Sequence, residues 1–151
     1  MPVLPTPDEE LTVRIRNAIQ RYMDSGDTWK MGEWVSRLCA LPVYGGIGAV
    51  LLVAADGTVY AFSNMEDGPP VVENDLGWQV VARVNAAKKY PELIALVPSR
   101  PPGISACARC NGDGVVRFRK HDFGCGGCHG LGWWDEDQPK GSQSGDSTPK
   151  Q

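Results

Sequence analysis

Two short cysteine segments have the residue types and spacing to bind a metal. Residues 107–114 and residues 125–132 both fit the pattern CxxCxGxG. A CxxC turn holds two thiolates at the spacing of one edge of a tetrahedron, and two such turns supply four sulfur ligands. Glycines after the second cysteine let the backbone reverse without a Cβ penalty. The pattern predicts one structural Zn²⁺ with four ligands, Cys107, Cys110, Cys125 and Cys128.

Other uses of these thiols fit the sequence less well. Four thiolates fill a tetrahedral shell and leave no position for water, so a hydrolytic site is not expected. Disulfides need an oxidising compartment, for which the sequence carries no signal. A redox-active CxxC usually needs a helix N-terminus, and neither turn precedes a helical pattern. His121 and His129 could be ligands, but four cysteines suffice. The fifth cysteine, Cys39, is expected to be a buried structural thiol.

The chain between the cysteine pairs predicts a β-hairpin finger. Residues 115–119 have strand character, residues 120–122 form the expected tip, and residue 123 begins the return strand. Strand alternation would place Arg117 and Arg119 on one face and two apolar residues on the other. The metal is therefore expected at the base of a finger.

The finger and the residues after it are the candidate partner-binding surface. The whole chain carries 15 basic and 18 acidic residues, a net charge of −3, which argues against a nucleic-acid binder that uses its whole surface. Phosphate contacts by the basic finger and base stacking on a tryptophan pair would still suit a nucleic acid. The tryptophans could instead bridge the finger and the preceding domain. The candidate residues are Arg117, Arg119, Lys120, His121, Trp133 and Trp134.

The octapeptide pair resembles the cysteine-rich zinc module of DnaJ-type co-chaperones. This resemblance covers residues 107–132 only and implies that the four cysteines bind zinc. Family members carry four copies and bind two zinc ions, whereas this chain has two copies, which implies one zinc. The chain has no J-domain His-Pro-Asp tripeptide, so stimulation of a partner ATPase is not implied. The resemblance does imply contact with proteins and not catalysis.

Residues 6–97 predict a small α+β domain that begins with two helices. The first should span residues 7–23 with Thr6 as its cap. The second should start at Asp27 or Thr28 and end near Cys39, before Pro42. Each has an apolar stripe at helical spacing, so the two are expected to pack as a helical hairpin.

A small antiparallel sheet and a third helix should complete this domain. Residues 49–54 and 58–62 are β-rich, and the Asp-Gly pair between them predicts a type I′ turn. Residues 71–73 could add a short strand. A helix capped by Asn74 or Asp75 should run to about Tyr90. Its predicted inward residues are Trp78, Val81, Ala82 and Ala86.

The order of helices, a Gly-Gly turn and a β-hairpin is similar to that of the SUKH superfamily. Many bacterial members of that superfamily are immunity proteins against secreted toxins. This second resemblance rests on layout and not on a motif. It implies a toxin as the protein partner.

Further along, the composition predicts a proline-rich linker at residues 98–103, a four-cysteine zinc hairpin at residues 104–135 and a disordered tail at residues 136–151. The longest apolar run, residues 47–55, is about half the ~20 residues that a membrane-spanning helix needs. The first residues lack the basic start and apolar core of a secretory signal, so a cytoplasmic location is expected.

The sequence offers no constellation for catalysis. Both histidines lie within the predicted zinc hairpin, so a Ser/His/Asp triad is not credible. Residues 45–48 are glycine-rich but lack the lysine of a phosphate loop and precede a strand. We therefore expect a non-enzymatic zinc-binding protein that acts by protein–protein interaction, with an immunity protein as one version. The alternatives are a nucleic-acid-binding zinc module and a DnaJ-like or redox-regulated chaperone.

Overall fold

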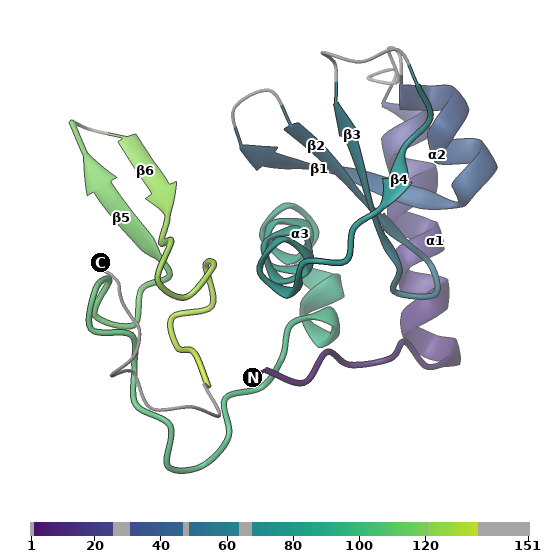
Figure 1. Ribbon diagram of the computed structural model, residues 1–151. Helices are drawn as coiled ribbons and strands as arrows, with labels where there is room; N and C mark the ends of the chain where they lie inside the picture. Colours follow the sequence, from purple (N-terminus) through teal and green to yellow (C-terminus); the bar gives the residue numbers. More distant parts are fainter. Residues whose placement is uncertain (1, 26–30, 47–48, 64–67, 120, 136–151) are drawn as a thin grey trace.

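The protein has an α+β fold with two antiparallel sheets (Figure 1). The computed structural model describes residues 2–25, 31–46, 49–63, 68–119 and 121–135. Its helices are α1 (Glu9–Asp24), α2 (Gly32–Leu38), α3 (Leu76–Lys89) and the 3-10 helix η2 (Pro91–Leu96). A four-stranded sheet contains β1 (Ala40–Gly46), β2 (Ala49–Ala54), β3 (Val59–Ser63) and β4 (Val71–Val72), in that order. A separate hairpin contains β5 (Val115–Phe118) and β6 (His121–Gly124).

Several predicted features lie outside these residues. The proposed caps Asp27 and Thr28 and the tail at residues 136–151 are among them. Within the part of the chain that the structure describes, no helix combines the length and the apolar character needed to cross a bilayer.

Helix α1 starts two residues later than predicted. The carboxylate of Asp8 accepts a hydrogen bond from the backbone N–H of Leu11 at 2.8 Å, so Asp8 is the cap and the prediction of Thr6 is wrong. A negatively charged cap also interacts favourably with the helix dipole, as a threonine hydroxyl does not. Helix α1 packs on β1 and η2, and α2 packs on β1, so the contact between the two helices that a helical hairpin requires is not the main contact of either one.

Strand β1 is the element that the sequence analysis missed. Its third residue, Pro42, was interpreted above as a helix stop but pairs with Leu52 of β2. A proline cannot donate a hydrogen bond to a neighbouring strand, but β1 is at the edge of the sheet, where a proline is tolerated. The preceding Cys39 has φ of 48°, ends α2 and lets the chain turn into the strand. Its side chain is half-buried against the core.

The predicted β2–β3 hairpin is confirmed, but with a different turn. Ala54 N–H donates to the Thr58 carbonyl at 2.8 Å, and Gly57 N–H donates to the Ala54 carbonyl at 2.9 Å. Gly57 has φ of 94°, whereas Asp56 is not among the residues with positive φ. A type I′ turn needs positive φ at both central residues, so this loop is a type I turn followed by a left-handed glycine. The short strand β4 is also present.

Helix α3 is buried on two sides. Asp75 caps it, as predicted, by accepting from the Trp78 N–H at 3.0 Å. Ala82 and Ala86 join the core between the helices and the larger sheet, whereas Val84 is buried outside that core. Figure 1 shows the β5–β6 hairpin on the other side of α3 from the sheet. Trp78 is 43% exposed, so its predicted inward position is wrong. The helical spacing of apolar residues identifies which face of a helix is buried, but it does not give the width of the surface that packs against that face.

A buried arginine on α3 connects three segments of the fold. Arg83 is 4% exposed, and its guanidinium donates to the carbonyls of Pro5 (2.7 Å), Leu96 (2.9 Å) and Gly57 (3.3 Å). Burial lowers the pKa of Arg83. These three hydrogen bonds offset part of the cost of removing the guanidinium from water, whereas its buried Nε has no hydrogen-bond partner among the described residues.

Replacing Arg83 by methionine should lower the free energy of unfolding by about 3 kcal/mol, because each buried carbonyl left without a donor costs roughly 1–3 kcal/mol. Urea denaturation of the full chain would measure this change. Arg16→Met, at an exposed position of α1, is the matched control and should change stability by less than about 0.5 kcal/mol. Equal midpoints for the two variants would contradict this role of Arg83.

Candidate metal centre

The four cysteines of the repeated motif come together in one cluster. Their Sγ atoms all lie within 4.8 Å of one another. Cys107 and Cys125 are separated by 3.8 Å, and Cys110 and Cys128 by 3.7 Å. A tetrahedral shell with metal–sulfur bonds of about 2.3 Å has edges of about 3.8 Å, so these separations fit it. The cluster could therefore hold one metal ion.

Two matching turns position the thiols. We call residues 107–114 the first knuckle and residues 125–132 the second knuckle. In each, the backbone N–H of the final glycine donates to the sulfur of the second cysteine: Gly114 to Cys110 and Gly132 to Cys128, both at 3.2 Å. The residue after that cysteine is left-handed in both, with φ of 56° at Asn111 and 55° at His129. The two knuckles thus repeat one conformation.

The two knuckles also contact each other through backbone hydrogen bonds. Cys107 N–H donates to the Gly132 carbonyl at 2.7 Å, and Cys125 N–H donates to the Gly114 carbonyl at 3.0 Å. A Cβ on Gly114 would lie 2.4 Å from the Gly130 oxygen, and one on Gly132 would lie 2.5 Å from the Gly112 oxygen. Each final glycine is therefore required by the opposite knuckle. The sequence analysis assigned the glycines only to local chain reversal and missed this second requirement.

The protein environment affects the thiols differently. Burial raises the pKa of Cys125 and raises that of Cys128 to about 12. Burial also disfavours the Cys110 thiolate, but hydrogen bonds from Gly114, from the neighbouring thiols and from Gly112 outweigh it and lower the Cys110 pKa to about 7. Thiols bind metal ions as thiolates, so loading this cluster requires release of protons.

The predicted finger is confirmed as the β5–β6 hairpin between the two knuckles. Val116 pairs with Phe123, and these side chains are 36% and 53% exposed. Arg117 pairs with Asp122, and its Nε donates to the carboxylate at 2.8 Å. Strand β6 begins at residue 121, earlier than expected.

The turn of the finger corrects one prediction about its charged face. Arg119 has φ of 51° and lies in the turn after β5, so it does not continue the strand alternation that was to place it beside Arg117. Lys120 lies outside the described residues, and the side chain of His121 is not described. Of the predicted basic cluster, the structure thus places Arg117 and Arg119.

The tryptophan pair lies at the base of the finger. Trp133 is 6% exposed and forms an isolated β-bridge with Ala106, so its side chain presents little surface to a partner. Trp134 packs against the cysteine cluster, and its ring centroid lies 4.6 Å from that of His129. Within the described residues, the thiol cluster consists of the four cysteines and does not include His129.

The metal module, which we define as residues 104–135, rests on α3. A Cβ on Gly130 would lie 3.2 Å from a methyl group of Val84. One on Gly77 would lie 2.6 Å from Cε1 of His129, so a glycine at the start of α3 makes room for this ring. Burial lowers the pKa of His129, and the nearby Asp75 carboxylate partly opposes this shift.

Comparisons with protein-family models, with curated proteins and with solved structures return no match for this chain. The resemblances to the DnaJ-type module and to the SUKH superfamily therefore have no support beyond the residues and the layout on which they rest. The geometry of the cysteine cluster stands independently of both.

Proposed function

We propose that this chain is a non-enzymatic protein that holds one structural Zn²⁺ and binds a protein partner through the finger. Four sulfur ligands in a tetrahedral arrangement are typical of Zn²⁺ or iron. Backbone N–H groups directed at two of the sulfurs stabilise thiolates around a dication. A site with four protein ligands has no open position for a substrate or water, which favours a structural role.

The observation that carries the binding proposal is the apolar side of the finger. Val116 and Phe123 are directly opposite each other on β5 and β6, and both remain exposed. An exposed aromatic residue beside an aliphatic one is a typical anchor of a protein interface. The metal cluster at the base of the finger would hold this pair rigidly, and rigidity lowers the entropic cost of binding.

Charge favours a protein over a nucleic acid as the partner. Arg117 is already in an ion pair with Asp122, so part of the basic character of the finger is neutralised within the hairpin. The net charge of −3 also repels polyanions. An acidic chain attracts basic partners, which fits the more specific version of this proposal, an immunity protein that neutralises a basic toxin.

An affinity experiment with the full zinc-loaded chain tests the proposal. We expect a stoichiometric protein partner from the native host, bound at least about 30-fold more weakly by the double variant Val116→Glu and Phe123→Glu, because interface anchors contribute about 2 kcal/mol or more. Val13→Glu, at an exposed valine of α1, is the matched control and should bind normally. Equal zinc content in all three proteins would show that the metal module is intact.

Two outcomes would contradict the proposal. Partner binding that survives the double variant would exclude the apolar side of the finger. Salt-dependent binding of RNA or DNA that is lost in Arg117→Glu with Arg119→Glu would replace the protein partner with a nucleic acid.

A further inference from the structure

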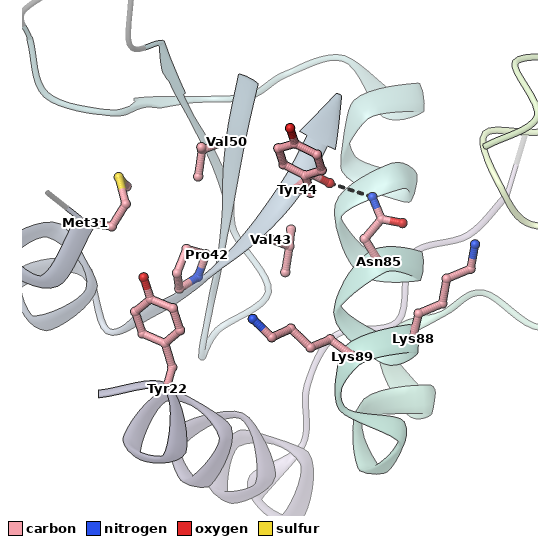
Figure 2. Close-up of a pocket in the computed structure, with 9 residues that line it drawn as sticks. All are labelled: Tyr22, Met31, Pro42, Val43, Tyr44, Val50, Asn85, Lys88 and Lys89. Carbon is pink, nitrogen blue, oxygen red and sulfur yellow. Dashed lines mark hydrogen bonds between the residues drawn. The ribbon is translucent and has the colours of Figure 1, made fainter. Parts of the chain in front are cut away.

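We propose that a second site, a cleft outside the metal module, binds a small organic acid with an apolar body. The cleft has a volume of about 600 Å³. It lies between the end of α1, the start of α2, strands β1 and β2, and the last turns of α3 (Figure 2). Pockets of roughly 300–1,000 Å³ are the usual size for small-molecule ligands. This site is independent of the proposed zinc and partner functions.

The floor and one end of the cleft are apolar. Val43 of β1 and Val50 of β2 lie along the floor, and Met31, which is 3% exposed, lies beside α2. The buried ring of Tyr22 forms a wall at the end of α1. These side chains suit an aromatic or aliphatic body, because water in contact with them gains few hydrogen bonds.

One cation is directed into this apolar space. Figure 2 shows the side chain of Lys89 extending from α3 toward Tyr22, and its Nζ lies 5.6 Å from the centre of the Tyr22 ring. The neighbouring Lys88 also borders the cleft, but in Figure 2 its side chain extends away from Lys89 and Tyr22, and its charge lowers the pKa of Asp122 in the finger as a minor contribution beside Arg117. The described residues that line the cleft include no carboxylate. An anionic group is therefore the complement of Lys89.

The wall beside Lys89 is held in place before a ligand arrives. Asn85 of α3 donates from its side-chain amide to the backbone carbonyl of Tyr44 on β1 at 2.6 Å. This hydrogen bond ties the helix that carries Lys89 to the strand that forms the floor (Figure 2). A preformed pocket loses less conformational entropy on binding, so a modest ligand can be retained. The chemistry points to a monocarboxylate with an aromatic or branched aliphatic body.

Titration of the full zinc-loaded chain with 4-phenylbutyrate, followed by the methyl resonances of Met31, Val43 and Val50, tests this site. We expect saturable shifts with a Kd of about a millimolar or lower. The neutral probe 4-phenylbutanamide should bind at least about fivefold more weakly. Lys89→Gln should abolish this preference for the acid, whereas the charge-preserving Lys89→Arg and the control Arg16→Gln, at an exposed position of α1 that does not line the cleft, should retain it.

Other results would overturn the inference. Equal affinity for the acid and the amide would show that Lys89 does not recognise an anion. Shifts confined to the finger would place the binding elsewhere, and no shifts at the three methyl groups up to the solubility of the probe would exclude a ligand of this class. Because zinc content and partner binding are measured separately, failure here is distinguishable from failure of the proposed function.

Discussion

Replacing Cys128 by serine should reduce the zinc content from one ion per chain to below roughly a tenth of that and unfold the metal module. Cys128 is fully buried and contributes one of the four sulfurs. A serine hydroxyl does not ionise near neutral pH, so it cannot replace the thiolate as a ligand. Structural zinc contributes on the order of 10 kcal/mol or more to the folding of small modules. Elemental analysis and amide hydrogen exchange over residues 107–132 would measure both effects.

Cys39→Ser is the matched control for that experiment. Cys39 is half-buried at the end of α2 and is not part of the thiol cluster. The same sulfur-to-oxygen change there should leave the zinc content at one per chain and cost only local packing. Full zinc content in Cys128→Ser would contradict a four-cysteine site, and zinc loss in Cys39→Ser would place a ligand outside it.

The second large effect is expected for Gly114→Ala. The new Cβ would lie 2.4 Å from the Gly130 oxygen, and φ at this position is 78°. The clash is with backbone, which cannot move without separating the two knuckles. We expect zinc affinity to fall by about 100-fold or more, because left-handed strain and overpacking each cost about 1–3 kcal/mol. Competition with a chelator on the purified chain would measure the change.

Two other glycines separate the causes of this effect. Gly103 also has positive φ, 88°, but a Cβ there would meet nothing within 4 Å, so Gly103→Ala reports backbone strain alone. Gly124 of β6 has neither constraint and should tolerate alanine without loss of affinity. Gly132→Ala should match Gly114→Ala, because its Cβ would lie 2.5 Å from the Gly112 oxygen. If Gly103→Ala were equally damaging, closure between the knuckles would not explain the motif.

Local and repeated signals were the ones that could be predicted from the sequence. The four cysteines follow from a doubled pattern, the β2–β3 hairpin from an Asp-Gly pair, and the start of α3 from the cap at Asp75. Each of these depends on residues within a few positions of one another. The turn type was nevertheless wrong, because an Asp-Gly pair also fits a three-residue loop in which only Gly57 is left-handed.

Features that depend on distant residues could not be predicted in this way. Pro42 is compatible with β1 only because the strand lies at the sheet edge, which becomes apparent once the sheet has formed. Gly77 has a low propensity for the first turn of a helix, and the reason for a glycine there is His129, whose ring leaves no room for a Cβ. The second constraint on Gly114 likewise comes from Gly130, across the hairpin. The cleft beside Lys89 unites residues from four elements with Met31, the N-cap of α2, and has no sequence signature.

The two-sided burial of α3 has a consequence for how the molecule can be divided. The proline-rich segment is an obvious position at which to truncate the chain. The side-chain packing nevertheless continues across it, because Val84 of α3 contacts Gly130 of the metal module while Ala82 and Ala86 face the sheet. A fragment that stops at residue 103 would expose to solvent an apolar surface along α3. Such surfaces promote self-association. The parts of the chain before and after the proline-rich segment are therefore better regarded as mutually dependent than as independent domains.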